Sequence, residues 1–359
     1  MKYILILGGT GAMGKHLVSI LRKDSGNHIY VTSRQKRKDE NNVSYIFGNA
    51  HNNEFIFSLL KERHWNAIID FMIYSTENFK NKVDCFLNAT DQYIYLSSAR
   101  VYAESNTPIV ETSDRLLDTC RDNAYLKTDE YALTKARQEN ILRKTGKTNW
   151  TIVRPYITFS EIRLQLGVLE KENWLYRSLH GRKIVVSKDI LERKTTLTYG
   201  YDVARGIAVL IGDEKAYGEI FHITTNESHT WQEILNVYLD VLEKYMGKRP
   251  KVLYLDKYPY QHKERPFYQL IYDRYFDRMF DNTKIGQFID ISTFTPTLEG
   301  LGQCLDTFLS RGKFRDINWK GEAGRDRLTG EFPNIKEFPN KSRMIKYFIQ
   351  RYILPKSYF

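Results

Sequence analysis

Three polar side chains of this chain could carry acid–base chemistry. Tyr131 and Lys135 are four residues apart, so both lie on one face of the helix predicted for residues 131–141. A tyrosine with its usual pKa of about 10 is a poor base at neutral pH, but an ammonium one turn away favours the phenolate and lowers that pKa. Ser98, at the end of a predicted strand, could then bind a substrate oxygen while Tyr131 takes or gives its proton. Taken alone, however, Tyr-x-x-x-Lys is also a common pair on helix surfaces.

A glycine-rich turn near the N-terminus could bind a cofactor. It lies between a predicted strand (residues 3–7) and a predicted helix (residues 15–21), and Gly9-x-Gly11-x-x-Gly14 follows the dinucleotide-binding pattern. Such glycines allow a tight turn, an approach of the backbone to a pyrophosphate and close helix packing, and the helix N-terminus attracts the phosphates. We expect a dinucleotide site here, and the alternative is an ordinary tight loop.

The residues after the second predicted strand (28–32) bear on which cofactor binds. A site for NAD(H) typically has Asp or Glu about 20 residues after the glycines, where it binds the ribose 2′-hydroxyl. This chain has Ser33 and Arg34 there, followed by Lys36, Arg37 and Lys38. A hydroxyl and a guanidinium can bind a 2′-phosphate that a carboxylate would repel. The sequence therefore favours NADP(H), with NAD(H) possible, and the alternative is a basic surface loop.

Alternating strands and helices position these side chains. Further strands are predicted at residues 43–47, 67–72 and 92–96, and helices at 52–63 and 77–89. This alternation predicts an α/β fold with a Rossmann-type, doubly wound parallel sheet. Ligands of such sheets bind outside the carboxyl ends of the strands, where Gly9, Phe71 and Ser98 all fall.

Several stretches together resemble the extended short-chain dehydrogenase/reductase family, which includes NAD-dependent epimerases and dehydratases. Besides the glycine turn and Tyr131-x-x-x-Lys135, they are residues 98–102, 153–156, 198–204 and 281–284, so the resemblance covers roughly residues 1–310. It implies that Ser98, Tyr131 and Lys135 are the catalytic residues of an enzyme acting on nucleotide-activated sugars. The cofactor-binding residues that we expect are Gly8, Thr10, Gly11, Ala12, Met13, Gly14, Ser33, Arg34, Asn49, Ala50, Phe71, Tyr131, Lys135 and Tyr156.

The residues beside the serine favour a reaction that consists of hydride transfer alone. Sugar dehydratases similar to this family place an acidic residue there, whereas this chain has Ala99 and Arg100, so an elimination would lack its general acid. The remaining reactions are reduction of a 4-keto sugar and C4 epimerisation, with the hydride carried by the nicotinamide. NADP(H) would suit a reductase, while the family's epimerases usually hold NAD. Either reaction would fit surface polysaccharide biosynthesis.

Some departures from the family pattern point to another function. Asn49 replaces a frequent aspartate, Asp70-Phe71-Met72 replaces a strand end of small residues, and residues 116–130 form a long insertion. These features resemble an atypical branch that includes chloroplast stem-loop-binding proteins, so RNA binding on the same fold is the alternative. The presence of Tyr131 and Lys135 favours chemistry. Nucleic acid is not the expected partner, because outside residues 267–288 no long basic stripe is interleaved with aromatic residues.

The length and composition indicate a globular chain of more than one part. Its 359 residues are 42% hydrophobic and carry a net charge of +11. We expect a dinucleotide-binding domain at residues 1–160 with its sheet completed by parts of 190–225, a smaller substrate-binding lobe at 161–310, and an extension at 311–359. The dispersed Cys85, Cys120 and Cys304 suit a reducing cytosol, and no metal-ligand cluster is expected. We therefore expect a cytoplasmic protein.

The C-terminal third offers a substrate site and an amphipathic helix. Arg193, Arg274 and Arg278 are the candidate substrate-binding residues, since guanidinium groups bind phosphates and the aromatic residues of 267–288 could stack on a base. The alternative is that those aromatic residues are core and the arginines solvated. Residues 314–341 are predicted to be loosely ordered. Residues 343–354 form a predicted basic amphipathic helix, ended by Pro355, which could dock on its own protein, on a partner subunit of a homodimer or on an anionic membrane.

Overall fold

The computed structural model describes residues 1–259 and 267–354, which form two compact units. Unit 1 comprises Met1–Thr158, Thr196–Ser228 and Arg278–Thr297, and unit 2 comprises the described residues of the remaining segments. The units are discontinuous in sequence, because the chain returns to the first unit after residue 195. Its strand Glu219–Ile223 pairs there with Trp150–Pro155.

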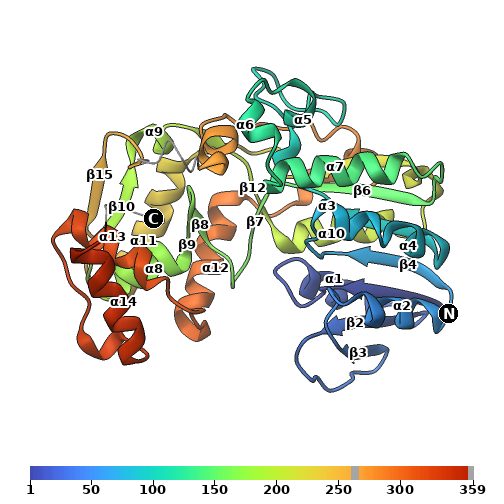
Figure 1. Ribbon diagram of the computed structural model, residues 1–359, viewed down its shortest axis with the longest axis horizontal. Coiled ribbons are helices and arrows are strands. Elements are labelled where there is room, and N and C mark those ends of the chain that lie inside the picture. Colours follow the sequence, from blue (N-terminus) through green and yellow to red (C-terminus); the bar gives the residue numbers. More distant parts are fainter. Residues whose placement is uncertain (260–266, 355–359) are drawn as a thin grey trace. The chain divides into compact units, whose positions relative to one another are not determined.

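A seven-stranded sheet forms the centre of unit 1 (Figure 1). All its neighbouring strands pair in parallel, in the order β13-β6-β5-β4-β1-β2-β3. The order reverses between β1 and β4, which is the switch point where such sheets bind ligands. The Rossmann-type doubly wound sheet predicted from the sequence is confirmed. Its strands are β1 (Lys2–Leu7), β2 (Asn27–Ser33), β3 (Val43–Phe47), β4 (Trp65–Asp70), β5 (Thr90–Leu96), β6 (Trp150–Pro155) and β13 (Glu219–Ile223).

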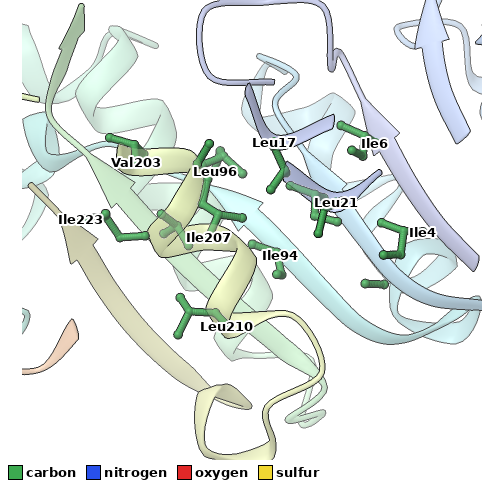
Figure 2. Close-up of a cluster of buried hydrophobic side chains, with 14 of the residues drawn as sticks. Ile4, Ile6, Leu17, Leu21, Ile94, Leu96, Val203, Ile207, Leu210 and Ile223 are labelled. Atoms are coloured by element: carbon green, nitrogen blue, oxygen red, sulfur yellow. The ribbon is translucent and has the colours of Figure 1, made fainter. Parts of the chain in front are cut away.

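Helices cover both faces of this sheet, and the alternation of side chains along β1 explains why. Ile4 and Ile6 join a core with α1 (Gly14–Leu21) and α10 (Gly200–Leu210), where Leu17 and Ile207 meet the sheet (Figure 2). The intervening Leu5 and Leu7 lie on the other face, with α2 (Asn53–Lys61), α4 (Val83–Asn88) and α7 (Tyr131–Arg143). Both faces of β1 are therefore buried, as a central parallel strand requires.

Shorter elements complete unit 1. They are α3 (Thr76–Lys80), η1 (Ala99–Val101), α5 (Leu116–Thr119), α6 (Asn123–Leu126), β7 (Ile157–Phe159, whose last residue falls in unit 2), β12 (Leu197–Tyr199), η2 (Glu214–Ala216), η4 (Ile285–Gln287) and η5 (Ile291–Thr293). The single helix predicted at 77–89 is wrong, because the chain breaks between α3 and α4. Lys82 sits at the break, buried, with its ammonium 3.1 Å from the carbonyl oxygen of His51.

Unit 2 combines short strand pairs with helices. Its strands are β8 (Gln165–Leu166), β9 (Leu169–Glu170), β10 (Ile184–Ser187), β11 (Lys194–Thr195), β14 (His229–Thr230) and β15 (Val252–Leu255). Its helices are α8 (Lys171–Leu179), α9 (Lys188–Leu191), α11 (Trp231–Met246), η3 (Leu270–Arg274), α12 (Thr297–Arg311, from its second residue on), α13 (Trp319–Thr329), η6 (Ile335–Glu337) and α14 (Lys341–Tyr352). Among the described helices, none is long and apolar enough to cross a membrane.

The segment 314–341, predicted to be loosely ordered, contains the helix α13, so that prediction is wrong. Glu322, Arg325 and Asp326 lie on one face of α13 and are almost completely buried. Arg177 and Arg182 pair with these carboxylates, so polar residues fill a place where apolar ones are usual. The helix predicted at 343–354 is present as α14, and its expected stop at Pro355 lies outside the described residues.

Candidate active site

The glycine turn connects β1 to α1 by close backbone packing. Gly8 adopts a left-handed conformation (φ 72°), and its N–H donates to the Thr32 hydroxyl at 3.1 Å. A Cβ at Gly14 would lie 2.6 Å from the backbone of Gly9, so any larger residue would push helix and turn apart. These positions require glycine for the reasons that the sequence pattern suggests.

The outer part of the turn is open. Thr10 and Gly11 are exposed, and a Cβ at Gly11 would meet nothing closer than the Gly8 carbonyl oxygen, at 4.0 Å. The half-buried Ala12 and Met13 follow, and the Met13 side chain makes no capping hydrogen bond to α1. The positive end of the α1 dipole therefore faces a turn with free space beside it.

The predicted adenosine-side residues lie at the ends of β2 and β3. The buried Ser33 hydroxyl is engaged locally, since it donates to the Gln35 carbonyl oxygen at 2.8 Å. Arg34 is exposed, and its charge helps lower the pKa of His51, after burial and the charge of Lys82. Arg34 is thus close to the loop that contains the exposed Asn49 and the buried Ala50.

The end of β4 lies beside the glycine turn. The half-buried Phe71 has its Cβ 3.6 Å from the position that a Cβ on Gly8 would take. The preceding Asp70 is fully buried and accepts hydrogen bonds from the Tyr93 hydroxyl at 2.8 Å and the Met72 N–H at 2.9 Å. Burial raises the pKa of Asp70 against the effect of these donors.

The three predicted catalytic residues gather around the end of β5. The buried Lys135 ammonium donates to the carbonyl oxygen of Leu96, the last residue of β5, at 2.6 Å. Ser98 follows two residues later, and its hydroxyl accepts from the Arg100 N–H at 3.2 Å. The Arg100 guanidinium lies 5.3 Å from the ring centre of Tyr131, so the first turn of α7 faces the segment that contains Ser98.

The buried ammonium of Lys135 has an unusual pKa. Burial lowers this pKa to about 8, although the nearby charges of Asp70 and Glu139 raise it. Lys135 is therefore largely protonated at neutral pH but close to its titration point. A buried cation one helical turn from Tyr131 is the arrangement that favours a phenolate there.

Arg100 and Glu130 belong to the site but were not predicted to do so. Arg100 forms an ion pair with Glu130 at 2.6 Å, and both side chains are mostly buried. The Glu130 carboxylate also accepts from the Ala132 N–H and from the Tyr125 hydroxyl, so it caps α7. A glutamate just before a predicted helix was the one signal available in the sequence.

A second buried ion pair fixes α7 to the sheet. Glu139 accepts two hydrogen bonds from Arg154 of β6, at 2.8 and 2.6 Å, and one from the Ser97 hydroxyl at 2.5 Å. Arg115 reaches the same carboxylate at 3.1 Å. Burial would raise the pKa of Glu139, but Arg154, Ser97 and Arg115 together lower it below its usual value. This cluster determines how α7 presents Tyr131 and Lys135.

The remaining predicted residues are distributed over both units. Tyr156 is buried after β6, with its ring 5.5 Å from that of Phe280. Arg278, in unit 1, is buried and donates to the carbonyl oxygens of Tyr102 and Ala103. Arg274 and the exposed Arg193 lie in unit 2.

Unit 2 contains a small apolar pocket, of about 20 Å³, and a buried arginine that bonds to one of its lining residues. The guanidinium of Arg274 is buried and donates to the carbonyl oxygen of Gly167 at 3.0 Å. Gly167 lines the pocket with Ser187 and Tyr258, and the other lining residues are Leu166, Val168, Leu169, Val185, Val186, Ile190, Leu191, Leu255 and Pro259. Within the described residues, the buried Ser187 hydroxyl has no hydrogen-bond partner.

Comparisons with known proteins agree with this fold. The enzyme WbmH from Bordetella bronchiseptica, solved with NAD+, is 15% identical with a TM-score of 0.65, over 87% of this chain and 100% of that one. The UDP-glucuronic acid 4-epimerase from Bacillus cereus, solved with UDP-glucuronic acid and NAD, is 18% identical with a TM-score of 0.64, over 86% and 99%. The dTDP-glucose 4,6-dehydratase from Bacillus anthracis, solved with NAD, is 18% identical with a TM-score of 0.66, over 87% and 97%. At these identities the likeness concerns the fold.

The sequence itself identifies the family. No curated protein matches the chain. A family model, described as the NAD dependent epimerase/dehydratase family, matches residues 4–224, which include the glycine turn, Ser98, Tyr131 and Lys135. This match covers more than half of the chain and confirms the resemblance inferred from its motifs. The chain therefore belongs to the NAD-dependent epimerase/dehydratase family.

Proposed function

We propose that this protein is an NAD(P)-dependent oxidoreductase or epimerase that transfers hydride at C4 of a nucleotide-activated sugar. The observation that carries the proposal is the buried Lys135 ammonium, held at the end of β5 one helical turn from Tyr131 and next to the Ser98 segment. Family membership and the UDP-glucuronic acid complex of the Bacillus cereus epimerase support the substrate class. A role in surface polysaccharide biosynthesis would follow from such a product.

The glycine turn is suited to a dinucleotide. The space beside Gly11 and the α1 N-terminus would accept its pyrophosphate, and Phe71 and Tyr156 would lie toward the nicotinamide. When bound, the nicotinamide supplies the hydride or accepts it. The protein's own part is to orient the substrate oxygen and to move its proton.

That proton would be exchanged with the Tyr131 hydroxyl. The Lys135 ammonium and the Arg100 guanidinium, 5.3 Å from the ring centre of Tyr131, both favour its phenolate. Ser98 would donate a hydrogen bond to the same substrate oxygen and hold it within reach of the phenol. Oxidation and reduction at C4 then differ in direction: oxidation passes the hydride to the nicotinamide and the proton to Tyr131, and reduction returns both to the substrate.

Hydride transfer without elimination is the reaction that the site favours. A dehydratase needs an acid to protonate the departing hydroxyl. The carboxylate beside Arg100 is that of Glu130, and it already accepts from Arg100, Tyr125 and the Ala132 N–H. A carboxylate engaged in three such interactions is a poor proton donor, which supports 4-keto reduction or C4 epimerisation.

The basic segment after β2 supports a preference for NADP(H). The exposed Arg34 would bind a 2′-phosphate, since the Ser33 hydroxyl is already bonded to Gln35. Titration of the purified protein with NADPH and NADH tests this preference, with Arg34→Ala as the variant. We expect tighter binding of NADPH and loss of that preference in the variant. Tighter binding of NADH, or tightly co-purified NAD, would contradict the preference and favour an epimerase.

For the nucleotide part of the substrate, the three predicted arginines differ in what they already bind. Arg193 is exposed and could bind a phosphate, whereas Arg274 and Arg278 already donate to backbone carbonyl groups. Binding of UDP-, GDP- and dTDP-sugars to an Arg193→Ala variant tests this assignment, and unchanged affinity would contradict it.

The decisive experiment replaces Tyr131 by Phe. We expect turnover of a UDP-, GDP- or dTDP-sugar to fall by about 10² to 10⁴, while the affinity for the cofactor is retained. Tyr245→Phe, at an exposed position of α11, is the matched control and should keep full activity. Turnover retained in Tyr131→Phe would overturn the assignment, and failure of the wild-type protein to bind either cofactor would favour RNA binding.

A further inference from the structure

The C-terminal helix α14 is attached to unit 2 by its polar face. It packs beside α13 (Figure 1), with Tyr347, Gln350 and Arg351 buried in the contact. The Tyr347 hydroxyl donates to the buried carboxylate of Asp326 at 2.8 Å, and Arg327 donates to the carbonyl oxygen of Arg351 at 2.8 Å. These bonds fix which side of the helix faces the protein.

The opposite face of α14 is apolar and exposed. Its residues repeat at intervals of three and four, so they form one stripe along the helix. The exposed fractions are 54% for Ile345, 37% for Phe348, 38% for Ile349, 64% for Tyr352 and 75% for Ile353, and Leu354 follows at 43%. This orientation is the reverse of the usual one, and a contiguous exposed apolar surface of this kind marks a contact site.

The charges around this stripe are positive. Lys341 and Lys346 on α14 and Lys336 just before it are exposed, and within the described residues none of them forms an ion pair. The sequence from residue 338 to the C-terminus contains Lys341, Arg343, Lys346, Arg351 and Lys356 and no acidic residue. Among those that the structure describes, Arg343 pairs with Asp316, an acid from outside the helix.

An apolar stripe surrounded by positive charges favours some binding partners over others. A second copy of the chain would bring the same lysines toward one another across the stripe, whereas an anionic lipid surface would neutralise them. An apolar stripe with basic margins is also the usual composition of helices that lie in the plane of a membrane interface. Phe348 and Tyr352 are of the aromatic type enriched at that level of a bilayer.

We propose that α14 is a peripheral membrane anchor for anionic bilayers. The stripe from Ile345 to Ile353 enters the boundary between headgroups and acyl chains, and Lys341 and Lys346 contact the anionic headgroups. The helix stays parallel to the surface, because its other face remains bonded to α13. The attachment is reversible, since it depends on one short helix.

Vesicle sedimentation of the full-length protein tests the proposal. We expect binding to vesicles that contain phosphatidylglycerol and weak binding to vesicles of phosphatidylcholine alone. Ile345→Ser combined with Tyr352→Ser should reduce the partition coefficient by about tenfold or more, because apolar side chains no longer enter the bilayer. The control is Tyr245→Ser, at a 59% exposed tyrosine of α11, which should bind like the wild type.

The charge contribution is measured separately. Lys341→Gln combined with Lys346→Gln should weaken binding severalfold, whereas Lys244→Gln combined with Lys248→Gln, at exposed positions near the end of α11, should not. Raising the salt concentration from about 50 mM to about 500 mM should weaken wild-type binding for the same reason. Circular dichroism melting checks that all variants remain folded.

Three results would overturn the proposal. One is the absence of vesicle binding by the wild-type protein, and another is equal binding by the stripe variant and the wild type. The third is a wild-type protein that does not bind vesicles but forms a concentration-dependent dimer, which the stripe variant does not form. In that case a second copy of the chain would be the occupant of the stripe. The cofactor affinity should be the same in all these variants, because α14 contributes no residue to the proposed active site.

Discussion

The helices α7 and α13 both bury charged residues, but these residues have different roles in the two helices. In α7 the carboxylate of Glu139 meets Arg154 of β6 at 2.6 Å, and Lys135 is buried one turn away. In α13 the carboxylates of Glu322 and Asp326 meet Arg177 of α8, at 2.8 and 2.6 Å. Each helix is thus attached to its unit by ion pairs excluded from water.

The carboxylates of both clusters pair with arginines, and the difference lies in the additional lysine beside the α7 cluster. The α13 cluster is built with arginines, whose charge does not change over any accessible pH. The α7 cluster stands beside a lysine, whose pKa is lowered to about 8 by burial. A fixed charge suits attachment, whereas a charge that titrates near neutral pH suits proton chemistry. Buried ion pairs therefore hold α13 in place, whereas in α7 they also surround a lysine that can take part in proton transfer.

The largest expected effect is that of Glu139→Gln. The variant leaves the buried Arg154 without its carboxylate partner, and breaking a buried pair of this kind typically costs about 3–5 kcal/mol. Denaturant unfolding should register this loss, and turnover should also fall because α7 loses its attachment. A loss below about 1 kcal/mol would mean that the ion pair does not hold α7 in place.

Glu322→Gln should destabilise the fold by a similar amount, about 3–5 kcal/mol, because it also breaks a buried ion pair, that with Arg325. Arg177 and Arg182 still pair with Asp326 after this change, whereas the buried Arg325 loses the carboxylate to which it donates two hydrogen bonds. We expect turnover and cofactor affinity to stay at wild-type values, in contrast to Glu139→Gln. A comparable loss of activity in both variants would contradict the separation between attachment and chemistry.

These two helices also show what the sequence could reveal. The α7 site was predictable because Tyr131 and Lys135 form a recognisable local pair after a glycine turn and a serine strand end. In α13 the buried stripe has the same helical spacing, Glu322, Arg325 and Asp326, but charged residues at such spacing usually indicate a solvated face. Their partner Arg177 is distant in the sequence, so no local sequence pattern indicates that these side chains are buried.

Whether a local pattern exists also explains which other features could be predicted from the sequence. The strands of unit 1 were predictable, because both faces of β1 must be apolar in a doubly covered sheet. The engagement of Glu130 with Arg100 and Tyr125 depends on the path of the chain between residues 100 and 130, which no periodicity encodes. For α14 the sequence predicted the amphipathic helix and not which face is buried, since that depends on Asp326 of α13.

A pH profile distinguishes the two clusters further. The Lys135 ammonium is lost as the pH rises through its pKa of about 8, so kcat/KM should fall above that pH, by about tenfold per pH unit. The negative charge of Glu139 raises this pKa, so Glu139→Gln should move the fall to lower pH, whereas Glu322→Gln should leave it unchanged. Identical profiles for both variants would show that Glu139 does not act on Lys135.

The smallest expected effect concerns the two faces of α14. Tyr347 and Tyr352 lie on one helix, but Tyr347 is fully buried with its hydroxyl on Asp326, and Tyr352 is 64% exposed. Tyr347→Phe should lower the free energy of unfolding by about 1 kcal/mol, the net value of a buried hydrogen bond, and Tyr352→Phe should change it very little. Equal effects in denaturant unfolding would mean that α14 is not held by its polar face. A loss confined to Tyr347→Phe would support the orientation that leaves the apolar stripe exposed. It would also show that the buried Asp326 of α13, besides pairing with arginines, holds α14 in place.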